Sequence, residues 1–339
     1  MFIKVVFLQI FGAPEIPYSK ISELMSNAPE IIVWAAPFMF IFVLLEWYIS
    51  HKENKKLYLK EETIGSVLVG VGNVAIAFGI KFFLFYLVIL VYNALSWRMY
   101  FNWWTIIPCY IILDFCSYWA HRISHQQRIW WATHIVHHSS ENYNLSVSFR
   151  LSWVQHVKII FFLPVALVGF HPVIFFIANQ IAVLFQFWVH TEYIKRLHPA
   201  MEFIFATPSN HRVHHGSQDK YINKNYGATF ILWDRLFGTY QKEDEQVKYG
   251  VTNNIKNKAN PLHINFHEFA DIWRDIKSVK SWRTRLFYIF GNPIAIWKSK
   301  QKNTVHVESS YTRTSWNIQK ERRLLKASDD RGYLASELN

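Results

Sequence analysis

The chain has 339 residues, of which 51% are hydrophobic and 18% aromatic, while only 18% carry a charge. The apolar residues gather in long runs, which argues against an ordinary soluble domain and indicates an integral membrane protein. The net charge of +12 would also suit a nucleic-acid-binding protein, but no such motif accompanies it. We therefore expect no nucleic-acid partner and a basic surface that faces anionic lipid.

The first half of the chain contains two apolar runs. Residues 1–30 begin with MFIKVVFLQIFGAP and are predicted to be an N-terminal, membrane-associated leader. Residues 31–49 are interrupted only by Glu46 and are long enough, at about 1.5 Å per residue, to cross a hydrocarbon core of about 30 Å. Residues 64–95 contain Lys81 and are longer. They form either one tilted span or a kinked or re-entrant pair.

Two further runs precede and follow the middle of the chain. Residues 103–119 form a third run, and residues 157–189 a fourth, which is broken by Gly169-Phe170-His171-Pro172. Proline lacks the amide that a helix needs and disfavours helix in the residue before it. The fourth run is therefore predicted to be a helical hairpin that returns to the side from which it enters.

Basic residues near the runs predict the orientation. The segment HKENKKLYLKEE at 51–62 contains four lysines, and the segment 92–102 contains only Arg98. Because basic loops stay in the cytoplasm, we place residues 51–62 there and residues 92–102 outside. The fold is thus expected to be an all-α, multi-pass membrane bundle. Its membrane-embedded domain covers residues 31–302, and residues 303–339 are a basic, flexible tail.

Histidines concentrate in three short windows. Residues 121–125 are HRISH, residues 134–138 are HIVHH, and residues 211–215 are HRVHH, so that eight of the 16 histidines lie in 15 positions. On a helix, side chains three and four residues apart share a face, so each window can aim its imidazoles at one point. The predicted topology brings the windows to one membrane face. The expected metal-binding and catalytic residues are His121, His125, His134, His137, His138, His211, His214 and His215.

Eight imidazoles exceed the four ligands of a structural zinc ion, so they suggest two metal ions. His190 in WVHTE is a ninth candidate ligand. Polar residues near the windows are expected to orient the imidazoles by hydrogen bonds. Asp114 and Tyr118 precede His121 by seven and three residues and share its helical face. The full set of expected supporting residues is Asp114, Tyr118, Gln126, Glu141, Asn144 and Glu192.

These motifs carry a family resemblance. HRISH, HIVHH and HRVHH in a membrane chain resemble the fatty acid hydroxylase and sterol desaturase superfamily of membrane di-iron oxygenases. The stretches HHSSENYNLSVSFR, QFWVHTEY, TPSNHRVHHGSQDKYINKNYGATFILWDRLFGTY and YGVT are similar to its alkylglycerol monooxygenase branch. One position departs from that branch, which usually has Glu directly after the second histidine of the first window, where this chain has Gln126.

The resemblance implies two iron ions, O2 and a lipid substrate with a polar head and a long chain. Such iron centres oxidise unactivated C–H bonds, which no side chain can do. The alkylglycerol branch hydroxylates the carbon next to an ether oxygen with electrons from tetrahydrobiopterin, while the sterol and fatty-acyl branches use an electron-transfer chain. No flavin, haem or nicotinamide motif occurs in the sequence, so the reductant or an electron-donor protein is expected to be external.

Three alternatives remain open at this stage. The first is a sterol or fatty-acyl hydroxylase or desaturase of the same superfamily. The second is a histidine-lined metal transporter, which would need ionisable residues along a path, whereas the runs contain few of them, among them Glu46, Lys81 and Asp114. The third is a zinc hydrolase, although HExxH and a nucleophile arrangement are absent from the sequence. The preferred hypothesis is a membrane-bound lipid monooxygenase.

Overall fold

The computed structural model of the chain describes residues 10–252 and 254–301. Over these residues the fold is helical, and two isolated β-bridges, Phe11 with Met99 and Phe205 with Phe230, take the place of strands. The expected all-α fold is thus confirmed for this part of the chain. The predicted tail at 303–339 lies outside the described residues.

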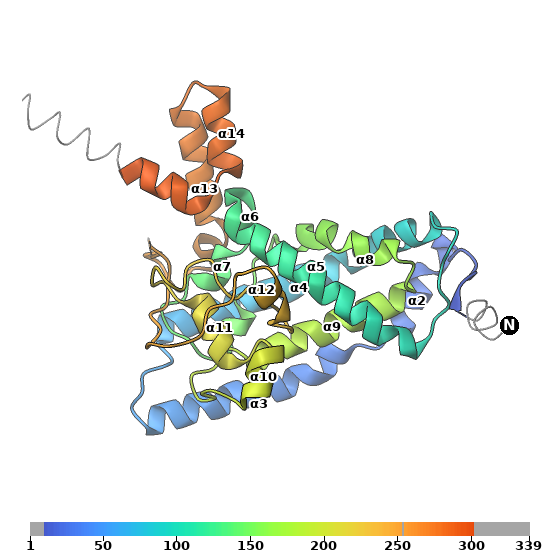
Figure 1. Cartoon of the computed structure of the whole chain (residues 1–339), viewed down its shortest axis with the longest axis horizontal. Coiled ribbons are helices and arrows are strands. Elements are labelled where there is room, and N and C mark those ends of the chain that lie inside the picture. The colour runs from blue at the N-terminus through green and yellow to red at the C-terminus, as the bar shows by residue number, and fades with distance from the viewer. Residues whose placement is uncertain (1–9, 253, 302–339) are drawn as a thin grey trace, which may run out of the picture.

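Four longer helices form the body of the molecule. They are α3 (Ile31–Lys52), α4 (Lys60–Asn93), α5 (Ile106–Gln126) and α9 (Pro172–Trp188). Figure 1 shows them running along the long axis of the molecule. Helix α9 contacts α3, α4 and α5. The largest apolar core joins α4, α5, α8 and α9 through residues such as Val88, Leu113, Val165 and Ile174.

Helix α4 decides between the two alternatives for residues 64–95. It is one continuous helix of 34 residues, which at 1.5 Å per residue is about 51 Å long. This exceeds a hydrocarbon core of about 30 Å, so the helix extends beyond the apolar layer at its charged N-terminal end. Glu61 and Glu62 lie in its first turn, where carboxylates complement the helix dipole.

The predicted break in the fourth apolar run is confirmed. Helices η4 (Gln155–Phe161) and α8 (Leu163–Leu167) precede it, and α9 begins at Pro172. Gly169 has a φ of +96°, and a Cβ atom there would lie 2.7 Å from the backbone oxygen of Trp97. Glycine is therefore required on both conformational and steric grounds.

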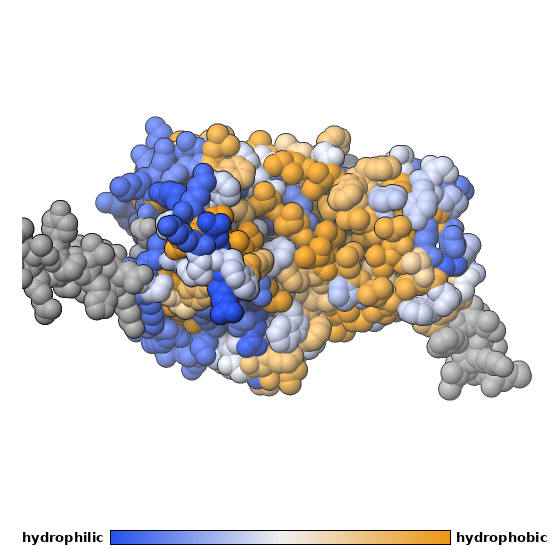
Figure 2. Space-filling view, turned by 90° about the horizontal axis from the view of Figure 1, so that it is seen from above, coloured by the Kyte–Doolittle hydropathy of each residue, from blue (hydrophilic) through white to orange (hydrophobic). Residues whose placement is uncertain are grey.

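The surface of α3 and α4 is apolar and exposed. The most apolar 18-residue windows of the segments Tyr18–Lys52 and Lys60–Asn93 are long enough to cross a membrane, and only 6% and 17% of them are buried inside the protein. A core helix of a soluble protein would be mostly buried, so these helices indicate a membrane protein. On the face seen from above, Figure 2 likewise shows an apolar surface over the middle of the molecule, with hydrophilic residues toward both ends and most of them at one end.

The two ends of the body carry different additional elements. At one end, η1 (Tyr18–Lys20), α2 (Ile21–Asn27) and η2 (Trp103–Thr105) lie near the C-terminal end of α4, where Ile21 packs against Phe85 and Ile89. At the other end lie α6 (Arg128–Ala132), α7 (Ile135–His138), η3 (Leu145–Phe149), α10 (Pro199–Ile204), α11 (Pro208–His215), α12 (Leu232–Leu236), α13 (Pro261–Ser278) and α14 (Trp282–Phe290).

Candidate metal centre

Four helices bring the histidines to the same end of the molecule. Helix α5 carries His121 and His125 in its last two turns, and His134 is the N-cap of the single-turn helix α7, which carries His137 and His138. Helix α11 begins with Thr207 as N-cap and Pro208 in its first turn, and it carries the third window. His190 follows the end of α9 by two residues. All eight window histidines and His190 thus meet in space.

The first group of histidines contains His121, His125, His134, His138 and His214. Four of these rings form an approximate square, in the order His121, His134, His138 and His214. The distances between successive ring centroids around it are 4.6, 4.8, 4.7 and 4.2 Å. His125 lies 4.8 to 5.3 Å from each of these four rings. The arrangement is that of four rings around a point with a fifth ring at an apex.

The second group consists of His137, His190, His211 and His215. Their Nε2 atoms form a closed ring, with successive separations of 3.1, 3.0, 3.2 and 3.0 Å. Four nitrogens at such spacing can all lie within bonding distance of a single metal ion. The two groups adjoin each other, since the ring of His138 stacks on that of His215 at 4.4 Å.

Hydrogen bonds among the imidazoles do not account for this geometry. Each neutral imidazole has one N–H group, yet in the second group every Nε2 has two others within 3.2 Å. In the first group, the Nε2 atom of His125 is buried and has no hydrogen-bond partner. A buried nitrogen without a partner is unfavourable, and a cation held between the nitrogens would satisfy it. The donor set therefore fits one metal ion in each group.

Backbone carbonyls fix the orientation of three rings. The Nδ1 atoms of His121, His190 and His214 lie 2.8, 2.6 and 3.0 Å from the carbonyl oxygens of Tyr226, Gln186 and Lys224. Because a carbonyl can only accept, each Nδ1 carries the proton and donates it. The Nε2 lone pair is then free to face the centre of the group, as in many metal sites.

Burial keeps the imidazoles neutral. The pKa of His190 and that of His214 are lowered to about 4, mainly because burial disfavours the imidazolium. Burial also lowers the pKa of His134, His137 and His211 well below the usual value. Protons therefore do not compete for these nitrogens at neutral pH, and the site offers uncharged ligands to a cation.

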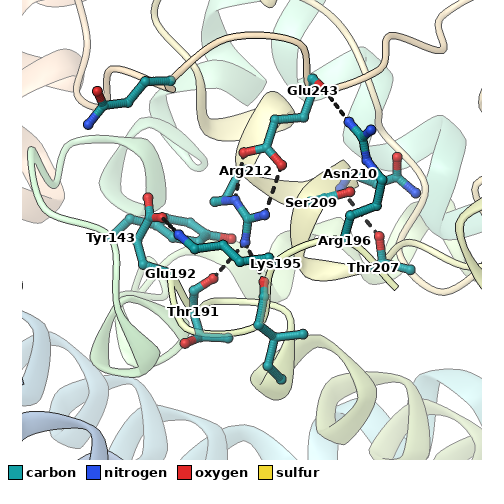
Figure 3. A network of polar contacts seen from close by, with 12 residues as sticks. Tyr143, Thr191, Glu192, Lys195, Arg196, Thr207, Ser209, Asn210, Arg212 and Glu243 are labelled. Atoms are coloured by element: carbon teal, nitrogen blue, oxygen red, sulfur yellow. Dashed lines mark hydrogen bonds and ion pairs between the residues drawn. The ribbon is translucent and has the colours of Figure 1, made fainter. Parts of the chain in front are cut away.

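Arg212 links α11 to the segment that carries His190. Its Nε and Nη2 atoms donate to both carboxylate oxygens of Glu243 at 2.7 and 2.8 Å, and its Nη1 donates to the carbonyl oxygens of Thr191 and Ile194. Figure 3 shows this network. The guanidinium is buried at 2% exposure. It holds the two segments of the second group at a fixed distance from each other.

The expected partners of the first window differ from those observed. The buried carboxylate of Asp114 accepts hydrogen bonds from the backbone N–H groups of Thr229 and Phe230 and from the indole of Trp233, not from an imidazole. The hydroxyl of Tyr118 contacts Thr239 and accepts from Arg122. Both residues therefore bind the segment that follows α11. The three N–H groups from this segment occupy the carboxylate of Asp114, so that it serves the segment and not an imidazole.

Of the other four expected supporting residues, one is exposed and three contact groups other than the imidazoles. Gln126 is exposed at the end of α5. Glu141 pairs with Lys258, and Asn144 accepts from the backbone N–H of Ser146. Glu192 accepts from the hydroxyl of Tyr249. Within the described residues, the contact of this set with the histidines is therefore indirect, through the stack of Tyr249 on Tyr143, whose ring lies 5.1 Å from that of His215.

Sequence reasoning missed the groups that contact the imidazoles. Three of these groups are the backbone carbonyls of Gln186, Lys224 and Tyr226, and no sequence signal identifies a carbonyl because every residue has one. The aromatic rings of Trp131, Tyr143 and Tyr226 also border the two groups. Their position beside or between the windows offers a signal, but it does not distinguish them from other aromatic residues of this chain.

Comparison with known proteins gives matches that cover the histidine windows. The model of the fatty acid hydroxylase family matches residues 105–239, a range that includes all three windows and His190. The chain is 35% identical to human alkylglycerol monooxygenase over 283 residues, which cover 80% of this chain and 61% of that protein. It is 26% identical over 164 residues to an ornithine lipid hydroxylase of Rhizobium tropici, covering 47% of this chain and 48% of that protein.

A third relative is methylsterol monooxygenase 1 of Rattus norvegicus, which is 28% identical over 159 residues, or 44% of this chain and 52% of the relative. Of the human alkylglycerol monooxygenase, the matched part of this chain covers about three fifths of the length. No solved structure matches the chain.

Proposed function

Residues 105–239 belong to the fatty acid hydroxylase family, and the chain is related over most of its length to alkylglycerol monooxygenases. From this premise we propose that the protein is a di-iron, O2-dependent monooxygenase. It hydroxylates a C–H bond of a membrane lipid. One observation carries the proposal. Nine buried or half-buried histidines form two adjoining groups, each with its nitrogens directed at a common centre.

The number of nitrogens favours iron. A structural zinc ion takes four ligands in a tetrahedron, whereas the first group offers five imidazoles. Imidazole suits iron, and two iron ions bound here would supply the O2-dependent oxidation of an unactivated C–H bond. The protein itself keeps the imidazoles neutral, fixes their tautomers through the carbonyl oxygens and surrounds the site with aromatic rings that limit access of water.

The proposed arrangement in the membrane is multi-pass, with the histidines at the cytoplasmic face. The basic segment between α3 and α4 supports this orientation, because Lys52, Lys55 and Lys56 lie at the same end of the body as the histidines. The exposed apolar sides of α3 and α4 support an environment of lipid. A substrate with a polar head and a long chain would then reach the site from the bilayer.

The favoured substrate class is an ether lipid. Hydroxylation of the carbon next to the ether oxygen consumes one O2, two electrons and two protons, and releases one water. One oxygen atom enters the substrate, and the resulting hemiacetal breaks its C–O bond to give an aldehyde and the glycerol. The electrons come from an external donor, which is tetrahydrobiopterin on the alkylglycerol assignment.

A sterol or fatty-acyl hydroxylase is the second candidate. The matches to a methylsterol monooxygenase and an ornithine lipid hydroxylase support it, as does Gln126 at the position where the alkylglycerol branch usually has Glu. Gln126→Glu tests this point. On the second candidate the substitution leaves the rate with every substrate unchanged, whereas a gain with ether lipid would assign the departure from the branch to that reaction.

The metal assignment is tested by counting iron in single-site variants. We expect two iron ions per chain in the purified protein loaded with Fe(II), and about one in both His125→Ala and His211→Ala, because each variant removes a ligand from a different group. His263→Ala is the matched control, since His263 is an exposed histidine on α13, and it should retain both ions. Wild-type iron content in the two ligand variants would contradict the assignment.

The reaction is tested with the full chain in lipid nanodiscs under 18O2. Labelled alkylglycerol, sterol and fatty-acyl substrates are supplied separately, with and without tetrahydrobiopterin. We expect pterin-dependent release of aldehyde from the ether lipid, with 18O in the aldehyde. Pterin-independent turnover of sterol or fatty-acyl substrate alone would favour the second candidate. Failure to incorporate 18O into any of the three with fully loaded protein would reject the oxygenase proposal.

A further inference from the structure

Helices α13 and α14 form a hairpin with an exposed apolar surface. Figure 1 shows both helices projecting sideways from the body near the end that carries α6, α7 and α11. Trp273 on α13 is 57% exposed and Trp282 on α14 is 65% exposed. Within each helix, the spacing of the exposed apolar residues puts them on one stripe. We call these six residues the hairpin surface: Leu262, Phe266 and Trp273 on α13, and Trp282, Leu286 and Phe290 on α14.

The opposite side of the hairpin is attached firmly to the body. Ile264 is fully buried and packs with Val69 of α4. Arg128 of α6 is buried and donates to Glu268 and Asp275 of α13, at 2.6 Å in both cases. This ion-pair network fixes the rotation of α13 about its axis. The hairpin surface therefore cannot turn inward, and its apolar residues stay exposed unless something outside the described residues covers them.

The hairpin surface has a basic border. Residues 271–290 contain five basic residues and two acidic ones. The acidic residues are already paired, Asp271 with Arg274 and Asp275 with Arg128. The ammonium of Lys277 lies 4.6 Å from the ring centroid of Trp273, and Arg283 lies over the ring of Trp282. Tryptophan beside lysine and arginine is typical of segments at the interface of a bilayer with anionic lipid.

The depth of the hairpin also agrees with an interfacial position. At the N-terminal end of α4, the cluster of charged residues ends at Glu62 and the exposed apolar run begins at Ile64, with Lys81 as the next charged residue along the helix. Ile264 packs against Val69, five residues along α4 from Ile64, and five residues of helix correspond to about 7.5 Å. An amphipathic helix in the interface buries its apolar face about 5 to 10 Å below the headgroups. The hairpin thus leaves the body at the level where the apolar layer begins.

We propose that the hairpin surface lies in the headgroup region of an anionic leaflet, on the side of the membrane where the histidines are. The occupant of this surface is lipid: the apolar stripe enters the upper acyl region, and Lys277, Lys280 and Arg283 contact the anionic headgroups. The hairpin would hold α6, which both of its helices contact, at a fixed depth. This proposal rests on the membrane setting and is independent of the metal and the reaction.

A fluorophore on the hairpin surface tests the proposal. The full chain with Trp282→Cys is labelled with the environment-sensitive dye NBD and reconstituted into vesicles of phosphatidylcholine and phosphatidylglycerol. The two native cysteines are buried, and Leu286→Cys serves as a second site. Lys242→Cys, exposed in a segment away from the hairpin, is the control. We expect blue-shifted emission at 282 and 286, loss of quenching by iodide and strong quenching by lipids with a doxyl group near the headgroup.

The controls separate lipid from other occupants. Replacing Lys277, Lys280 and Arg283 together by Gln should reduce the doxyl quenching in vesicles with phosphatidylglycerol and have little effect in phosphatidylcholine alone. Emission and iodide quenching at 282 and 286 equal to those at 242 would overturn the proposal. A second result would also overturn it: the dye is shielded from iodide to an extent that depends on the protein-to-lipid ratio, and doxyl lipids do not quench it. That result assigns the surface to a second copy of the chain. None of these measurements requires metal or turnover.

Discussion

Each histidine side chain has two nitrogens, and the backbone around it decides which of them faces the site. In His121 and His214 the Nδ1 atom donates to a carbonyl oxygen, so Nε2 points to the common centre. The sequence predicts polar side chains as the hydrogen-bond partners of the histidines, whereas the partners of these two rings are main-chain carbonyls. A carbonyl oxygen orients an imidazole without adding a negative charge to a buried site.

At the residue scale, Asp114 offers one prediction. Its carboxylate accepts three N–H bonds from residues 229–233, a segment close to the carbonyl of Tyr226 that holds His121. Asp114→Asn places an NH2 group against N–H donors, and we expect a loss of about 1 to 3 kcal/mol in unfolding free energy. Thermal unfolding in detergent measures the loss. Asp219→Asn, at an exposed position, should have no effect, and equal stability of both variants would refute the assigned role.

Arg212 offers a second prediction at this scale. Lysine keeps the positive charge but cannot make the bidentate contact with Glu243 together with two bonds to carbonyl oxygens. Arg212→Lys should therefore lower stability by about 2 kcal/mol and weaken iron binding in the second group, where His190 and His211 must stay in register. The control is Arg196→Lys, because Arg196 is exposed and donates to Glu243 from outside. Identical iron affinity of wild type and Arg212→Lys would contradict the bracing role.

At the element scale, glycines allow other segments to approach α4 closely. A Cβ atom at Gly72 would lie 2.4 Å from the indole of Trp153, and the same indole donates to the carbonyl oxygen of Val69 at 2.9 Å. Gly79 on the same helix has no atom within 4 Å of its Cβ position. The helix thus has one side against which the segment after the second window packs, and another side that is open.

The two glycines give a matched pair of variants. Gly72→Ala should displace Trp153 and lower stability by about 1 to 3 kcal/mol, as overpacking usually does. Gly79→Ala adds a better helix former without a clash, so it should be neutral or stabilising by up to about 1 kcal/mol. Unfolding curves of the two variants in the same detergent make the comparison. A loss of stability at Gly79 equal to that at Gly72 would show that packing on Trp153 is not the cause.

At the scale of the whole molecule, the two ends of the body are chemically different. The histidines and the lysines of the 51–59 segment lie at one end, and residues 10–30 lie at the other. The segment between these ends includes the exposed apolar sides of α3 and α4. A body with two polar ends and an apolar middle has a defined direction in a bilayer, and the basic end is expected in the cytoplasm.

Labelling of single cysteines tests this direction. In cells that express the chain, a membrane-impermeant maleimide should modify Lys20→Cys on intact cells and Lys56→Cys only after the membrane is opened. Both positions are exposed on the protein, so accessibility depends on the membrane alone. Modification of Lys56→Cys on intact cells would place the histidines on the outer side and reject the cytoplasmic assignment.

The sequence by itself determined the helical class, the apolar runs and the break at Gly169, because helical periodicity, proline and glycine act locally. It also determined which imidazoles could share a helix face, since a spacing of three or four residues is a local property. Whether residues 64–95 bend was beyond it. In the tertiary structure these residues belong to one helix, against which Trp153 and Ile264 pack from distant parts of the chain.

Only the tertiary structure decided how the nine histidines divide. His137 and His138 are neighbours in sequence but belong to different groups, and His214 and His215 divide in the same way. Adjacent side chains on a helix point about 100° apart, so α7 and α11 each serve both groups only when they lie between α5 on one side and His190 on the other. That placement depends on long-range contacts such as Arg212 with Thr191 and Asp114 with Thr229, which no local pattern encodes.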